Sequence, residues 1–597
     1  MASTRLRHCA AMDLSECEMK SSVACCAFQI GVCLVCLLCL LMQACGGKRN
    51  GFEGNIDLTW GRLGVFVSGF QSRPVSLRGE LGADHIDAPL VSTGGRQAFA
   101  QMDWRPGTAY QFFLVTEDGS THSLDGTSPL KPSPVLVQII DLDNILPFLG
   151  RQQVSHRPTF VRFSPRGDRL ALGTSEGYVA AFDTLSGETI WSDRISEGQA
   201  KNAAFSRDGS VLYIGEQAPD GFVYAFSMNA TKGLGKVLWK YRLADDLGTS
   251  LPVDASDQHA WIQFPGTYRV LTHPEGDLLV LSSHSWEDTS GGHARSCLYR
   301  LDGEHGVVRW RWPSDAPCPL TTMWFDSSAD GRTLALVAHE RHGGTNDPLG
   351  RFVPGTIYLV NGGTGEEIAS YTIPPLKPYF KSVIFWRSVA LRPDGRSLCA
   401  TSGDGRGFLF DLETIPETGF VPQRVLELAT PFESGGIPVV ATVGTIAALQ
   451  NAAIFVTGSS YIPIHLRDAA EEPPSLHPNG NTCFAFDWNG HKLWQYRMTN
   501  SDQGIAVSSD GRFIALPLSS GEVSSFQSGE RGVVLLDTTR SGSGDEKYLY
   551  TYSIEGTIPY DTIDISPDGL CVAVAEVPFF TSDRGETRGK SRVHIVH

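Results

Sequence analysis

The chain has 597 residues, of which 19% are charged and 41% are hydrophobic, so most of it can form packed cores and extensive disorder is excluded. Its 49 Lys and Arg residues against 65 Asp and Glu residues give a formal net charge of −16 at pH 7. A surface that follows nucleic-acid phosphates needs the opposite sign, so the charge argues against nucleic-acid binding.

The first 45 residues contain eight of the 13 cysteines and a long uncharged apolar stretch. Residues 23–44, VACCAFQIGVCLVCLLCLLMQA, are enough to cross a bilayer as a helix. The stretch ends in Ala44 before Cys45 and Gly46. Residues 1–44 are therefore predicted to be a signal peptide or a membrane anchor.

This ending resembles the signal of bacterial lipoproteins, in which a small residue precedes a cysteine that is acylated and becomes the first mature residue. The resemblance implies lipidation, for example with palmitate, at Cys45. Met42 and Gln43 depart from the family's usual Leu and small residue. An uncleaved transmembrane helix and a removed secretory signal are the alternatives. All three place the rest of the chain in the cell envelope, facing the periplasm or the exterior, and the first two anchor it to the membrane.

Residues 54–130 alternate apolar and polar residues over short segments, which is typical of half-buried antiparallel strands. The segment 104–110, WRPGTAY, followed by QFFLV resembles the tyrosine corner of fibronectin type III domains. The resemblance implies a small β-sandwich in which the Tyr110 hydroxyl bonds to the chain just upstream. A generic strand–turn–strand is the alternative. Residues 131–156 are predicted to be a linker that contains one strand, 134–140.

Residues 157–597 repeat a unit of four predicted strands. Each unit opens with an apolar strand and a tight turn, which recurs at 164–167, 206–209, 273–276, 328–331, 392–395, 509–511 and 566–569. A third strand often ends in an apolar residue plus Asp, at 183, 411, 487 and 537. The fourth often reads Gly-x-x-x-Trp, at 187–191, 235–239, 306–310 and 490–494. Four strands per unit at this spacing predict the blades of a β-propeller.

The fourth-strand pattern resembles the PQQ-like repeat, and the turn resembles that of WD-repeat propellers. With one unit near 446–458 that lacks the turn, we expect an all-β chain with an eight-bladed propeller, seven blades being the alternative. The last unit lacks a fourth strand. We expect residues 134–140 to pair with residues 592–597, which would close the ring and remove its open edges.

The units differ mainly in the connection between their second and third strands, which is enlarged in five of them. In propellers such insertions share one face, and insertions on one face commonly form the binding face. The aromatic candidates on this rim are Trp286, Tyr461, His465, Phe579 and Phe580. The alternative is that these insertions are only tolerated loop growth.

No motif indicates a catalytic residue, a metal site or a cofactor. The G-x-S-x-G sequence at 173–177 precedes a predicted strand, whereas a nucleophile elbow needs a helix there. The Asp residues that end third strands are expected to bond turn backbone, and the motif tryptophans to pack between blades. Quinoprotein dehydrogenases resemble this repeat but use adjacent paired cysteines, and the only adjacent pair, Cys25 and Cys26, lies in the leader.

If the chain is exported, as its N-terminal segment predicts, its remaining cysteines are expected to form at most one disulfide. Cys297 and Cys318 are both expected at one edge of the third unit and could form a disulfide, the alternative being two free thiols. Cys399, Cys483 and Cys571 lie in apolar strands and are expected to be buried thiols.

These observations favour a membrane-anchored, exported propeller that acts as a binding or scaffold protein for a protein or another envelope component. The functional analogy is with the propeller lipoprotein that helps to assemble outer-membrane proteins. The alternative is an enzyme, either a quinone-dependent oxidoreductase or a hydrolase, with a site at the propeller channel. Clustered His, Asp and Glu at the channel mouth would favour the enzyme, whereas an apolar or aromatic rim would favour a partner.

Overall fold

The computed structural model describes residues 57–597 except for some internal segments. These are residues 61–63, 71–72, 95–96, 103–104, 106, 130–132, 147–155, 250–260, 289–290, 340–354, 375, 377–386, 462–476, 502–503, 519–529 and 582–585. The predicted signal with Cys45, and the rim residue His465, lie outside the described residues. None of the helices in the described part has both the length and the apolar character needed to cross a bilayer.

The segment from Asp57 to Thr127 forms two four-stranded antiparallel sheets. The first has the order β1 (Asp57–Trp60), β2 (Gly64–Ser68), β6 (Gln97–Gln101) and β5 (Val91–Gly94). The second has the order β4 (Asp84–Pro89), β3 (Pro74–Leu81), β7 (Ala109–Thr116) and β8 (Thr121–Thr127). Phe112 and Leu114 are buried while the intervening Phe113 is exposed, because successive strand side chains alternate between faces. Trp60 and Leu77 share the same buried cluster.

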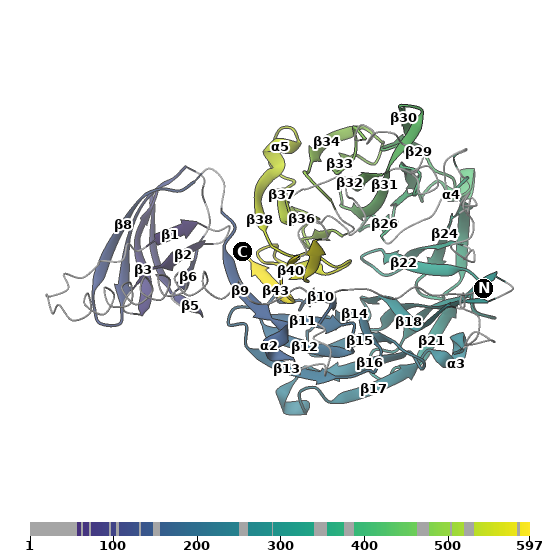
Figure 1. The fold of residues 1–597 in the computed structure, drawn as a ribbon, viewed down its shortest axis with the longest axis horizontal. Coiled ribbons are helices and arrows are strands. Elements are labelled where there is room, and N and C mark those ends of the chain that lie inside the picture. Colours follow the sequence, from purple (N-terminus) through teal and green to yellow (C-terminus); the bar gives the residue numbers. More distant parts are fainter. Residues whose placement is uncertain are drawn as a thin grey trace, which may run out of the picture. The chain divides into compact units, whose positions relative to one another are not determined.

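The rest of the described chain forms four-stranded antiparallel units that follow one another around a ring (Figure 1). The second and third units are joined into one eight-stranded sheet by the pair Gln217 and Gly266 of β15 and β18. The first unit consists of β10 (Pro158–Phe163), β11 (Arg169–Thr174), β12 (Tyr178–Asp183) and β13 (Thr189–Arg194), and the second of β14 (Gln199–Phe205), β15 (Val211–Gln217), β16 (Phe222–Ser227) and β17 (Val237–Arg242). The third unit consists of β18 (Trp261–Thr272), β19 (Leu278–Asp288), β20 (Gly291–Leu301) and β21 (Val308–Trp312). The fourth consists of β22 (Thr321–Ser327), β23 (Thr333–His339), β24 (Gly355–Asn361) and β25 (Glu367–Thr372).

The ring continues through sheets built in the same order. The fifth unit consists of β26 (Val389–Leu391), β27 (Ser397–Thr401), β28 (Arg406–Asp411) and β29 (Arg424–Glu427). The sixth consists of β31 (Ile437–Ala448), β32 (Ala453–Tyr461), β33 (Thr482–Phe486) and β34 (Lys492–Arg497), with β30 (Phe432–Ser434) paired to β31. The seventh consists of β35 (Ala506–Val507), β36 (Phe513–Leu518), β37 (Gly532–Asp537) and β38 (Tyr548–Ser553), and the last of β39 (Ile563–Ile565), β40 (Val572–Glu576), β43 (Arg592–Val596) and β9 (Leu136–Asp141). The hairpin β41 (Phe579–Thr581) and β42 (Glu586–Arg588) lies between β40 and β43 in the chain.

Helices in the described part are single turns at the ends of strands. They are α2 (Leu142–Ile145), η1 (Ala230–Lys232), α3 (Ala244–Leu247), α4 (Ile415–Thr418) and α5 (Gly544–Lys547). The ring of four-stranded sheets is a β-propeller, which confirms the predicted all-β class and the propeller architecture.

The turn between the first and second strands is held by the same bonds in several units, although not in the first and third. In the turn at 206–209, the Ser206 hydroxyl donates to Asp208 Oδ1 at 2.7 Å and accepts from the Val211 N–H at 2.9 Å. Gly209 has a φ of 73°, a left-handed conformation that favours glycine over residues with a Cβ. Side-chain bonds of the same kind join Ser328 to Asp330 and Ser566 to Asp568. The predicted hairpin turn is therefore confirmed.

The Asp residues that end third strands bind the turn that follows. Asp183 Oδ1 accepts from the Leu185 N–H at 3.1 Å and from the Ser186 N–H at 2.8 Å. Asp487 Oδ1 accepts from the Asn489 N–H at 2.9 Å in the same way. This confirms the structural role predicted for these carboxylates.

Neighbouring sheets are joined by the tryptophan of one fourth strand and the glycine of the next. The Trp239 indole N–H donates to the Gly303 carbonyl at 3.0 Å, and its ring lies so close to Gly306 that a Cβ there would be 2.5 Å from Trp239 Cε3. Trp310 likewise donates to Gly362 at 3.1 Å and covers Gly365. The predicted inter-blade packing of these tryptophans is confirmed.

The last strand in the chain pairs with the strand that precedes the ring. In this antiparallel pair of β43 and β9, Val593 lies opposite Ile140 and His594 opposite Ile139. Val593 and Ile140 are buried in one hydrophobic cluster with Leu170 of the first sheet. This pairing, predicted from the missing fourth strand, joins the end of the ring to its beginning.

The disulfide considered for Cys297 and Cys318 is not formed, and this expectation is corrected. Both are buried free thiols. Cys318 pairs with Ser296 in an antiparallel bridge, so its side chain shares a face with Ser296 and lies opposite to the face of Cys297. Accordingly, Cys297 packs in the cluster that contains Tyr299, whereas Cys318 packs in a separate cluster with Leu298. Of the other cysteines, Cys399 and Cys483 are buried and Cys571 is partly buried.

We expect Gly306→Ala to destabilise the chain more than Gly276→Ala. Both glycines have positive φ, 70° and 92°, so each alanine carries a conformational cost of about 1–2 kcal/mol. Only at Gly306 does the new Cβ also collide with Trp239, which adds overpacking of about 1–3 kcal/mol, while at Gly276 nothing lies within 4 Å of it. Urea denaturation measures both free energies of unfolding. Equal losses would show that the tryptophan contact does not hold the sheets.

Candidate functional site

A cavity of about 270 Å³ lies in the channel that the innermost strands surround. It is lined by Arg162 of β10, Asn202 of β14, Arg269, Val270 and Leu271 of β18, Trp324 and Asp326 of β22, Val389 and Ala390 of β26, Ile446, Ala447 and Ala448 of β31, Ile505, Ala506 and Val507 at β35, Asp564 of β39, and Arg387, which precedes β26. The first strand of each sheet therefore contributes to a single space.

Asp561 is the centre of a buried polar cluster at this cavity. It accepts hydrogen bonds from Arg162 Nη2 at 2.6 Å, from Arg387 Nη2 at 2.5 Å and from Asn202 Nδ2 at 3.2 Å. Arg387 also donates to the Ile505 carbonyl, so its side chain joins segments that are more than a hundred residues apart. We call Arg162, Asn202, Arg387 and Asp561 the channel cluster.

Two members of the channel cluster have an uncommon backbone conformation. Arg387 and Asp561 have φ of 57° and 59°, and they are bonded to each other. Left-handed conformations of residues other than glycine are uncommon and persist where the surrounding structure holds them. Both residues of this ion pair are therefore held in a backbone conformation that costs energy.

The carboxylates at the channel differ in their pKa. Burial alone would raise the pKa of Asp561, but the charges and hydrogen bonds of Arg162 and Arg387 outweigh burial and hold this pKa well below its usual range. Burial raises the pKa of Asp564, against opposition from Arg162 and the Phe163 N–H. Asp561 is therefore a fixed anion between two cations, whereas Asp564 is a carboxylate that burial disfavours when ionised.

Arg269 and Trp324 form the side of the cavity next to this cluster. The Arg269 guanidinium lies 3.5 Å from the centre of the Trp324 ring, and its Nη2 lies 3.2 Å from Asp326 Oδ1. Asp326 also accepts from the Leu391 N–H at 2.9 Å, and burial raises its pKa. The Arg387 guanidinium lies 5.0 Å from the same indole. Two cations therefore flank one tryptophan.

The sequence left two alternatives for the channel mouth: clustered His, Asp and Glu for an enzyme, or an apolar or aromatic rim for a partner. The residues that line the cavity are a mixture of charged and aliphatic ones. Its acids are neutralised by arginines or accept backbone N–H groups, and the described residues contain no group of three His, Cys, Asp or Glu side chains placed to hold a metal ion. No rim of aromatic side chains surrounds the cavity either, since Trp324 is the one aromatic residue in its lining. The arrangement is suited to binding a charged or polar group and provides no free acid–base pair among these lining residues.

The predicted rim residues lie on hairpins of different sheets. Trp286 lies in β19, where it is paired with Ile262 of β18 on one side and with His293 of β20 on the other, and Phe579 lies in β41. Tyr461 ends β32, and Phe580 follows Phe579 in β41. All these segments connect the second strand of a sheet to its third, as predicted. The Arg531 guanidinium lies 3.7 Å from the centre of the Phe579 ring.

Trp286 belongs to a ladder of aromatic and cationic side chains on one face of its hairpin. Its ring stacks between His284 at 4.9 Å and His293 at 5.1 Å, with the Arg295 guanidinium 5.4 Å away. Burial lowers the pKa of His284, whose Nδ1 bonds the Gln263 carbonyl at 2.9 Å. The sequence analysis missed these three partners. The cross-strand pairs 284–295 and 286–293 could have identified them once the hairpin register was known.

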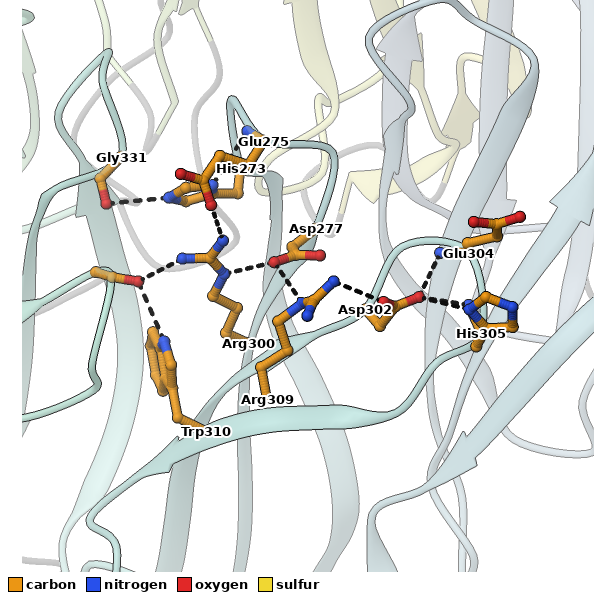
Figure 2. A network of polar contacts seen from close by, with 11 residues as sticks. His273, Glu275, Asp277, Arg300, Asp302, Glu304, His305, Arg309, Trp310 and Gly331 are labelled. Carbon is orange, nitrogen blue, oxygen red and sulfur yellow. Dashed lines mark hydrogen bonds and ion pairs between the residues drawn. The ribbon is translucent and has the colours of Figure 1, made fainter.

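A second polar network lies near the turns of the third sheet in the ring (Figure 2). Arg300 Nε donates to Asp277 Oδ2 at 2.6 Å, and its Nη1 donates to the Gly362 carbonyl of the next sheet at 3.0 Å. Arg309 Nε lies 2.8 Å from Asp277 Oδ2, and its Nη2 lies 2.7 Å from Asp302 Oδ2. Figure 2 shows that these side chains point toward one another between adjacent turns. The network ties neighbouring sheets together and is therefore structural.

Comparison with known proteins agrees with the propeller. Residues 175–416 match the family model described as outer membrane protein assembly factor BamB, of the PQQ type. This part of the β-propeller is therefore similar to the PQQ-type propeller that the model describes. No curated protein matches.

Two solved structures are similar at low identity. BamB from Moraxella catarrhalis is 15% identical with a TM-score of 0.42, over 78% of this chain and 99% of that one. The Cps50 (Swd1) β-propeller domain from Myceliophteria thermophila is 14% identical with a TM-score of 0.38, over 75% of this chain and 98% of that one. Likeness at this level carries no argument about what this chain binds.

We expect Asp561→Asn to destabilise the chain by about 3–5 kcal/mol at pH 7, because it leaves Arg162 and Arg387 buried without their anion. The folded-state pKa of Asp561 is lowered, so its stabilisation is complete above its unfolded pKa near 4 and is lost as the pH falls towards the folded value. The difference in the free energy of unfolding between wild type and this variant should therefore shrink below about pH 4.

Asp564→Asn is the matched control, since the pKa of Asp564 is raised by burial. Ionised Asp564 costs stability at neutral pH, and wild type regains that stability as the group protonates on acidification. The free energy of unfolding of Asp564→Asn should therefore fall further below that of wild type as the pH is lowered. Urea denaturation at pH 7 and near pH 3.5 measures both variants. The same pH trend in both would contradict the assignment of charges.

Proposed function

We propose that this chain is an exported, membrane-anchored propeller that acts as a binding or scaffold protein for a protein or another component of the cell envelope. The observation that carries the proposal is the match of residues 175–416 to the BamB family of outer-membrane assembly factors. The position of the insertions supports it, because each joins the second strand of a sheet to its third and so emerges at one rim. No nucleic acid and no cofactor enter this proposal.

We propose that the ring has eight blades. The support is that eight first strands each open a unit of four neighbouring strands and each contribute residues to the cavity lining. They are β10, β14, β18, β22, β26, β31, β35 and β39. In the last of these sheets, β9 takes the place of the fourth strand, so that it consists of β39, β40, β43 and β9.

We propose that the segment 54–130 is a fibronectin type III-like domain. Its two sheets, in the order β1-β2-β6-β5 and β4-β3-β7-β8, have the strand arrangement of such sandwiches. Tyr110 stacks on Phe112 at 5.0 Å and lies 5.4 Å from Trp60, so the predicted corner tyrosine belongs to the sandwich core. Its role would be to space the propeller from the membrane.

The partner is expected to contact the ladder around Trp286. A large aromatic side chain at the centre of an interface commonly carries 2 kcal/mol or more of binding energy, so Trp286→Ala should weaken binding by about thirtyfold. Leu185→Ala is the control, because Leu185 is an exposed apolar residue, whereas Trp286 is partly buried, and it lies in a third-to-fourth strand turn, at the opposite end of its sheet. Crosslinking and affinity purification of the membrane-extracted full chain measure recovery. Equal recovery with both variants, or no stoichiometric partner with wild type, would contradict the proposal.

We expect acylation at Cys45, so that Cys45→Ser abolishes incorporation of labelled palmitate in a bacterial host and releases the chain from the membrane fraction. Each buried methylene contributes about 0.8 kcal/mol, so the loss of the acyl chains removes the anchor. Cys39→Ser, within the same apolar stretch, should leave both readouts unchanged. Retention of unacylated Cys45→Ser and of unacylated wild type in the membrane would instead identify an uncleaved transmembrane anchor.

A further inference from the structure

Strand β38 ends the seventh unit on the side away from the channel, and its sequence, YLYTYS, contains no charged residue. The strands that end the other units each contain at least one charged residue, such as Arg194 in β13, Lys240 in β17 and Arg311 in β21. The same holds for β25, β29, β34 and β9. Charged side chains on an edge strand hinder pairing with a further strand. The edge at β38 lacks this protection.

The backbone groups of Thr551 and Ser553 face this edge. Ser553 lies opposite Gly532 in the pair of β38 and β37. The N–H of Ile554 donates to the carbonyl of Arg531 at 3.0 Å, which makes the pair of Ser553 and Gly532 a non-hydrogen-bonded one. Ser553, and Thr551 two residues earlier, therefore direct their own N–H and C=O groups away from β37. In the described part of the chain β38 pairs with β37 alone, so these groups are available to another strand.

An acidic side chain stands at each end of this uncharged edge. Asp545 lies in α5, just before β38, and Glu555 follows the strand. Both are exposed, and neither forms an ion pair with a described residue. Lys547, which lies between Asp545 and the strand, is buried, and its Nζ donates to the Thr538 carbonyl at 3.0 Å. A strand that pairs here meets neutral side chains along its centre and an anion at each end.

We propose that β38 binds an extended segment of a partner protein as an additional strand, and that this segment has an uncharged centre with lysine or arginine at both ends. Main-chain hydrogen bonds to Thr551 and Ser553 hold the segment, and Asp545 and Glu555 attract its basic ends. A second copy of β38 fits less well, because antiparallel pairing brings Asp545 of one copy towards Glu555 of the other. The edge belongs to a different unit from Trp286, so its failure would leave the proposed contact there untouched.

The test uses the full chain in lipid nanodiscs and a fluorescent peptide of five alternating threonines and valines with two lysines at each end, followed by fluorescence polarisation. One control peptide has glutamates in place of the lysines. A second keeps the lysines but is methylated at every backbone nitrogen of its centre, which removes the N–H donors. We expect the lysine peptide to bind about tenfold more tightly than either control, because the first loses the attraction at both ends and the second loses strand hydrogen bonds.

Two proline variants test whether the edge of β38 is the site. Thr551→Pro removes an N–H that faces outward and makes no bond to β37, and it should weaken binding of the lysine peptide about tenfold. Ser192→Pro on β13 is the matched control. There the Ile195 N–H donates to the Gly177 carbonyl at 2.9 Å, so the Ser192 N–H faces outward in the same way, but this strand is protected by charges. Ser192→Pro should leave binding unchanged.

A charge-reversed variant tests the ends without altering the edge. In the double variant Asp545→Lys with Glu555→Lys, the glutamate peptide should bind about tenfold more tightly than the lysine peptide, the reverse of wild type. Thermal unfolding without peptide shows whether Thr551→Pro remains folded. If it does not, the double variant and the comparison of the three peptides still decide the matter.

Several results would overturn the proposal. Equal binding of the methylated and unmethylated lysine peptides would show charge attraction without strand pairing. Equal effects of the two proline variants, an unchanged peptide preference in the double variant, or no binding by wild type would also contradict it. Sedimentation of the full chain in detergent tests the other occupant, since a wild-type dimer that Thr551→Pro converts to a monomer would assign the edge to a second copy.

Discussion

The contact between a fourth-strand tryptophan and a glycine of the next sheet is the constraint on which the ring depends. The indole packs where a Cβ would stand, and its N–H is satisfied by a backbone carbonyl of that next sheet, as for Trp239 with Gly303 and Gly306. Because the contact is made to backbone, it sets the spacing between sheets with little freedom for adjustment. Where the spacing of the outer strands is set, that of the inner strands follows, and with it the width of the channel.

The same logic explains why the ring must close with a strand from outside the repeat. A four-stranded sheet that lacked its last strand would expose an edge and part of an apolar face. Strand β9 covers the edge because its backbone pairs with β43. It covers the apolar face because Ile140 packs in the cluster that contains Val593 and Leu170. Closure also brings Asp561, which lies shortly before β39, next to Arg162 of β10, so the channel cluster exists only in the closed ring.

Two clusters of side chains in the protein are held together by different interactions. On the β19–β20 hairpin, the Trp286 ring stacks between His293 and the buried His284. The channel cluster instead joins charged side chains of separate sheets around the Asp561 carboxylate. An overall charge of −16 does not describe either region, because both are locally rich in arginine or histidine.

The sequence by itself determined the local structure: the turns, the strand alternation, the Gly-x-x-x-Trp motif and the missing final strand. Each is set by φ preferences, by the two-residue period of strands or by side chains within a few positions of one another. The channel cluster could not be predicted, because residues 162, 387 and 561 meet only when the ring has closed. The faces of Cys297 and Cys318 were likewise decided by the pairing of residue 318 with Ser296, since a shift of one residue in register reverses every side chain.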